Sequence, residues 1–63
     1  MTKAYFMKRH GLVLRPVTAE DRAVARTDYQ READYIMEYK GSEWFSKRGT
    51  LKDMQYMVET LGD

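Results

Sequence analysis

The stretch from Thr18 to Lys40 constrains the fold most, because it shows helical periodicity over more than a third of the chain. It follows Pro16 and opens with Thr-x-x-Asp, a pattern typical of a helix N-terminus. It closes at Gly41, a residue that suits the position after a helix. Apolar side chains recur every three or four residues, as on one side of an amphipathic helix. The pattern predicts one long helix over residues 19–40.

A second amphipathic pattern predicts a short helix over residues 51–61. Thr50 and Asp53 repeat the opening signature, and Gly62 supplies the stop. The connector 41–49 has no clear pattern, and one helical turn at 42–45 is an option. The short helix has apolar side chains at spacings of three and four, and the connector adds two large aromatic residues. We expect these side chains to form the contact between the two helices of one chain. These residues are Trp44, Phe45, Leu51, Met54, Val58 and Leu61.

The first 17 residues have β rather than helical character. Two apolar runs, 4–7 and 12–14, flank a turn that contains Gly11. A short β-hairpin fits this pattern, and a loosely ordered arm fits it nearly as well, because an isolated hairpin is marginal in water. We therefore predict an all-α fold, with a basic arm over 1–17 and a helical hairpin domain over 18–63.

The small size of the chain favours association. Sixty-three residues form one small domain, and the absence of cysteine excludes disulfide bonds as its support. Two helices in contact would leave a broad apolar face of the long helix uncovered, which soluble monomers rarely tolerate. A homodimer is the simplest cover for this face. The predicted interface residues are Tyr29, Ala33, Tyr35, Ile36, Met37 and Tyr39.

The net charge is only +1, but the charges are unevenly distributed. All four charged side chains of the first 17 residues are basic, so this segment could contact phosphates or an acidic protein surface. The simpler interpretation, which we prefer, is that this segment balances the charge of the acidic helical body of the dimer. Residues 42–61 also fit a helix-turn-helix, in which Asp53 and Glu59 would oppose phosphate approach. DNA binding is therefore the alternative function. Its contact residues would be Lys3, Lys8, Arg9, Arg15, Lys52 and Gln55.

The sequence carries no motif for catalysis or for a cofactor. It has no Gly-rich phosphate loop, no paired nucleophile and base, and one histidine, His10, in a basic turn. We therefore expect no enzyme activity, no cofactor and no metal. No apolar run approaches the roughly 18 residues that span a bilayer, and the lack of cysteine fits a reducing compartment. We expect a soluble cytoplasmic protein with no membrane partner.

The opening MTKAYFMKRHG and the closing MQYMVETLGD resemble the small early proteins of lambdoid temperate phages. The resemblance covers the whole chain. It implies a non-enzymatic accessory protein, made early in infection or induction in the bacterial cytoplasm, that adjusts host growth or the choice between lysis and lysogeny. The family supplies no catalytic residues. The expected function is an interaction module that binds a host or phage protein.

Overall fold

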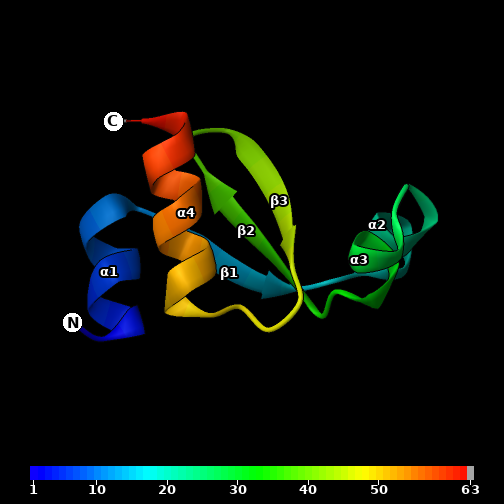
Figure 1. The fold of residues 1–63 in the computed structure, drawn as a ribbon, viewed down its shortest axis with the longest axis horizontal. Helices are drawn as coiled ribbons and strands as arrows, with labels where there is room; N and C mark the ends of the chain where they lie inside the picture. Colours follow the sequence, from blue (N-terminus) through cyan, green and yellow to red (C-terminus); the bar gives the residue numbers. More distant parts are fainter. Residues whose placement is uncertain (63) are drawn as a thin grey trace.

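The computed structural model describes residues 1–62 and combines helices with a β-sheet (Figure 1). Its three strands form one antiparallel sheet in the order β1-β2-β3. The prediction of an all-α helical hairpin is therefore wrong, and residue 63 of the predicted domain lies outside the described residues. In chain order the elements are α1 (Lys3–His10), β1 (Val13–Pro16), α2 (Ala19–Ala23), α3 (Asp28–Glu32), β2 (Tyr35–Tyr39), β3 (Ser42–Ser46) and α4 (Leu51–Leu61).

Two short helices and a strand replace the predicted long helix. The predicted N-cap is confirmed, since the Asp21 N–H donates to Thr18 Oγ1 at 3.1 Å, but α2 ends after five residues. Thr27 then caps a new helix, α3, by accepting the N–H of Gln30 at 3.1 Å. The segment 35–39 is rich in aromatic and aliphatic side chains that suit a pleated strand. The segment predicted as one helix is therefore interrupted twice, first by the helix cap at Thr27 and then by the strand at residues 35–39.

The glycine interpreted as a helix end belongs instead to a hairpin turn. Lys40 and Gly41 have φ values of 51° and 79°, and they join β2 to β3 as a two-residue loop. Positive φ at both loop residues is characteristic of the type I′ turn, whose twist matches that of paired strands. Residues 42–45, for which one helical turn was an option, are therefore part of β3. Trp44 and Phe45 are consecutive residues of this strand, so their side chains point to opposite faces of the sheet.

The N-terminal segment forms a helix and an edge strand, so the predicted arm or hairpin is wrong. Thr2 caps α1 by accepting the N–H of Tyr5 at 3.1 Å. The helix ends at Gly11, whose φ of 68° lets the Leu12 N–H donate to the Met7 carbonyl at 3.0 Å. Part of the predicted second strand is found in β1. However, β1 pairs with β2 rather than with residues 4–7.

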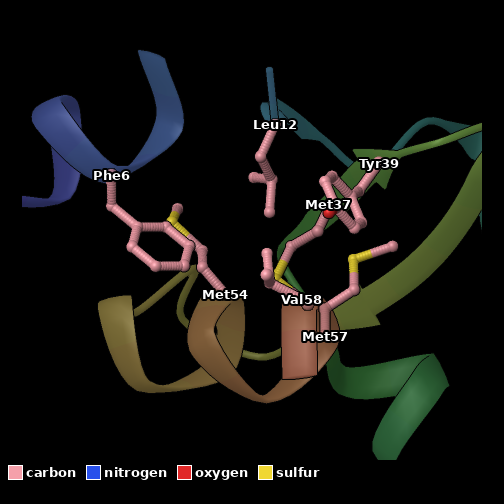
Figure 2. Packing of buried hydrophobic residues seen from close by; sticks show 7 residues of the cluster. All are labelled: Phe6, Leu12, Met37, Tyr39, Met54, Met57 and Val58. Carbon is pink, nitrogen blue, oxygen red and sulfur yellow. The ribbon is translucent and has the colours of Figure 1, made fainter. Parts of the chain in front are cut away.

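The core lies between the sheet and two helices, α1 and α4, which run side by side (Figures 1 and 2). The helix predicted over 51–61 is confirmed, and Thr50 caps it. Met54 and Val58 are buried as predicted, but Leu61 is 37% exposed, and Met57, which was not predicted, is fully buried. The buried cluster consists of Phe6, Leu12, Met37, Tyr39, Met54, Met57 and Val58, with Met7, Leu14, Trp44 and Leu51 packed against it.

The residues predicted to form the dimer interface do not share one helix face. Within one chain, Ala33, Ile36, Met37 and Tyr39 are already buried, each with at most 4% of its surface exposed. Tyr35 is half-buried in β2. The uncovered helix face that motivated the dimer prediction is therefore absent from residues 1–62, because β2 and its neighbouring strands occupy this stretch.

Candidate interaction surface along strand β3

The face of the sheet opposite α1 and α4 carries a row of charged side chains around one arginine. The strand register places Arg15, Ile36 and Phe45 side by side across β1, β2 and β3. Glu38 and Glu43 are register partners on the same face. This face therefore combines a buried aliphatic centre, Ile36, with a cation and two acids.

Arg15 bonds three carboxylates from three elements. Its Nη1 lies 2.7 Å from Asp21 Oδ2, its Nε lies 2.7 Å from Glu38 Oε2, and its Nη2 lies 3.2 Å from Glu43 Oε2. The guanidinium, followed by the backbone N–H of Thr18, lowers the pKa of Asp21 below its usual range. The guanidinium also lowers the pKa of Glu38. Arg15, which lies in β1, thus links α2, β2 and β3 through its ion pairs. Its guanidinium was predicted to contact phosphate, but it is paired with carboxylates of its own chain.

We expect Arg15→Gln to lower the urea midpoint of unfolding at pH 7 and to lower it by a smaller amount near pH 2. The lowered pKa of Asp21 and Glu38 stabilises the fold above about pH 4, the usual carboxyl value, and this contribution is lost as pH falls through the folded-state pKa. Without the guanidinium, Glu38 and Glu43 also repel each other at neutral pH. Urea titrations at both pH values measure this difference.

Arg31→Gln is the matched control, because Arg31 pairs only with the exposed Asp28 within the described structure, in an i, i+3 pair at 2.8 Å. Such surface pairs contribute little to stability. Equal losses from the two variants at pH 7 would contradict the role assigned to Arg15.

The two edges of the sheet differ in their capacity to accept another strand. At the β1 edge, Pro16 has no N–H to offer, which is one common protection of an edge. At the β3 edge the two-residue loop makes Tyr39 and Ser42 a hydrogen-bonded pair, and bonded pairs then alternate along the hairpin. By this alternation, Glu43 and Phe45 direct their backbone N–H and C=O groups outward. No strand within residues 1–62 pairs with them.

A groove of about 400 Å³ follows this β3 edge, between the strand and α3. Helix α3 is held beside the end of β3 because Tyr29 Oη accepts the Lys47 N–H at 3.2 Å and Glu32 pairs with Lys47 Nζ at 3.0 Å. On the helix-bearing side of the strand, the Trp44 ring lies 5.9 Å from that of Tyr56. We call this hollow the β3 groove. Its lining residues are Thr27, Tyr29, Gln30, Glu43, Trp44 and Phe45.

The other predicted contact residues lie on the helical layer, away from Arg15. Lys3 Nζ donates to the Gly49 carbonyl at 3.0 Å, which places Lys3 near the start of α4. Lys8 and Arg9 are exposed on α1, and Lys52 and Gln55 are exposed on α4. The predicted nucleic-acid contacts are therefore divided between two sides of the molecule, with Arg15 on the opposite face of the sheet.

Sequence reasoning missed Thr27, Gln30 and Glu43 as parts of a surface. It named Tyr29 as a dimer contact and Trp44 and Phe45 as packing residues, and the structure brings these three to one groove. The signal that could have located β3 is the Lys-Gly pair between two runs of apolar and aromatic residues, which is typical of a tight hairpin.

Comparisons with protein-family models, with curated proteins and with solved structures find no match to this chain. Within residues 1–62, no group of three histidine, cysteine or acidic side chains is placed to hold a metal ion. None of the described helices is both long and apolar enough to cross a membrane.

Proposed function

We propose that this protein is a non-catalytic interaction module that binds another protein through the β3 groove. The observation that carries this proposal is the gathering of Tyr29, Trp44 and Phe45 beside a strand edge with unpaired main-chain groups. Tyrosine and tryptophan are the residues that most often dominate binding energy at protein interfaces. Tyr29 is 45% exposed although it lies beside the sheet.

The partner is proposed to be a host or phage protein in the bacterial cytoplasm. This part of the proposal rests on the resemblance to the small early proteins of lambdoid temperate phages. By that resemblance, binding would modulate host growth or the choice between lysis and lysogeny.

Duplex DNA binding is the less favoured candidate, since its predicted contacts do not converge. Arg15 is surrounded by carboxylates, while Lys8, Arg9 and Lys52 lie on the helical layer. Binding through phosphates must weaken steeply as salt rises, and it is strongest at about 50 mM salt or below. A salt titration with duplex DNA therefore distinguishes this candidate from protein binding.

We expect affinity capture from nuclease-treated bacterial lysate to recover one specific protein, and Tyr29→Ala to reduce its recovery roughly tenfold or more. The substitution removes an exposed aromatic side chain and also the acceptor of the Lys47 N–H that helps to hold α3 beside β3, so both effects contribute to the expected loss. Quantitative mass spectrometry of the captured proteins provides the measurement.

Tyr5→Ala is the matched control, because Tyr5 is 54% exposed on α1 and does not line the β3 groove. This variant should recover the partner as the wild type does. Recovery of nucleic acid alone, or equal recovery by the wild type and Tyr29→Ala, would contradict the proposed function.

A further inference from the structure

We infer that the β3 groove binds its partner by strand addition: an extended segment with one cationic side chain pairs with β3 as a fourth strand. This inference rests on the proposed function and specifies how the partner is held. Three features of residues 1–62 occur together at this place: β3 has an unpaired edge, a groove lies beside that edge, and the charge in the groove lining is negative. Strand addition to an exposed sheet edge is a recurring mode of peptide recognition.

The main chain of β3 offers two donors and two acceptors to such a segment. Glu43 and Phe45 face outward because Ser42, Trp44 and Ser46 are bonded to β2 in the hairpin register. An incoming strand would pair with the outward groups of Glu43 and Phe45 without breaking any bond of the sheet. The groove's volume of about 400 Å³ suits a short extended segment rather than a folded domain.

Side chains on both sides of the edge define what the segment must carry. Successive residues of an added strand point to opposite faces, so one set would meet Phe45 and Tyr29, and the other would meet Trp44 and Tyr56. Apolar side chains suit both positions. The residues of the added strand that lie beside Trp44 on one face of the sheet, and those that lie beside Phe45 on the other, should therefore be apolar.

The charge of the segment follows from Glu43. This glutamate is the charged residue among those lining the groove, and 59% of its side chain is exposed. Its bond to Arg15, at 3.2 Å, is longer than the 2.7 Å contacts that Arg15 makes with Asp21 and Glu38. Glu43 is thus the carboxylate of this cluster that can pair with a cation from outside. A lysine or arginine in the segment would meet it.

The test pans a displayed library of random heptapeptides against the folded protein and two variants. The wild type should enrich apolar sequences with one lysine or arginine. Glu43→Gln keeps the main chain and removes the charge, so it should enrich apolar sequences without the basic residue. Glu43→Pro removes the same charge and, in addition, an outward donor that bonds nothing in the sheet. The peptides enriched on Glu43→Gln should therefore bind Glu43→Pro about tenfold more weakly than they bind Glu43→Gln, as expected for one unmade main-chain hydrogen bond.

A chemically synthesised chain with an N-methylated Phe45 amide provides a second variant that removes one outward donor and keeps every side chain. It should lose binding as Glu43→Pro does. Amide exchange of the wild type should slow at Glu43 and Phe45 when an enriched peptide is added. Strand addition would be overturned by peptides that bind the N-methylated chain as tightly as the wild type and bind Glu43→Pro as tightly as Glu43→Gln, or by no enrichment at all.

Two further outcomes separate this inference from the proposed function. If Tyr29→Ala abolishes capture of the partner while Glu43→Pro and the N-methylated chain retain it, the interaction module stands and strand addition fails. If exchange at Glu43 and Phe45 slows as the concentration of the protein alone rises, the occupant is a second copy, and the inferred peptide partner is wrong.

Discussion

Met57→Ala should destabilise the protein by about 2–5 kcal/mol, the usual cost of truncating a buried methionine. Met57 is fully buried between α4 and the sheet, where its loss leaves a cavity (Figure 2). A domain of this size seldom has more than about 3–5 kcal/mol of stability, so this loss should remove a large part of it. Urea unfolding followed by circular dichroism measures the effect.

Leu61→Ala provides the comparison within the same helix. Leu61 is 37% exposed at the end of α4, so its truncation should cost about 0.5 kcal/mol or less. The sequence pattern assigned the core position to Leu61 and overlooked Met57. A larger loss from Leu61→Ala than from Met57→Ala would show that α4 packs on the sheet through the side that carries Leu61 rather than the side that carries Met57.

Gly49→Ala should cost about 2–5 kcal/mol, because two penalties add at one position. Gly49 has a φ of 61°, which costs an alanine about 1–2 kcal/mol. An added Cβ would also lie 2.9 Å from Leu14 Cδ2 and 3.2 Å from Tyr35 Cδ2, and such overpacking costs about 1–3 kcal/mol. The loop before α4 thus packs closely against β1 and β2. Urea midpoints of the variant and the wild type measure the loss.

Gly11→Ala isolates the first of these penalties. Gly11 has a similar φ of 68°, and no described atom lies within 4 Å of the Cβ that alanine would add. Its loss should therefore be the backbone cost alone, about 1–2 kcal/mol. Equal losses from the two substitutions would mean that Leu14 and Tyr35 do not pack against the loop.

Local signals predicted the starts of helices well. Thr18 and Thr50 act as N-caps, and α4 has the predicted bounds. These features depend on hydrogen bonds between residues three positions apart, which a sequence pattern records directly. Thr2 caps α1 through the same type of hydrogen bond, but the apolar runs at 4–7 and 12–14 led to the prediction of strands instead of a helix.

The sheet could not be predicted in the same way, because its stability depends on contacts between distant segments. The run Tyr35–Tyr39 places apolar residues at spacings that fit a helix face as well as a strand. Its strand form is stabilised by pairing Arg15 with Ile36 across 21 positions and by the tight turn at Gly41. The β3 groove depends on the same long-range arrangement, since it forms only where α3 returns beside β3.

Amide hydrogen exchange along residues 42–46 of the free protein tests directly whether β3 has an open edge. If β3 is an edge strand bonded to β2, the amides of Trp44 and Ser46 should exchange slowly and those of Glu43 and Phe45 quickly. This alternation would establish the open edge on which the proposed binding depends. Uniform protection of all four amides would contradict it, because a helix or an already covered edge protects Glu43 and Phe45 as well.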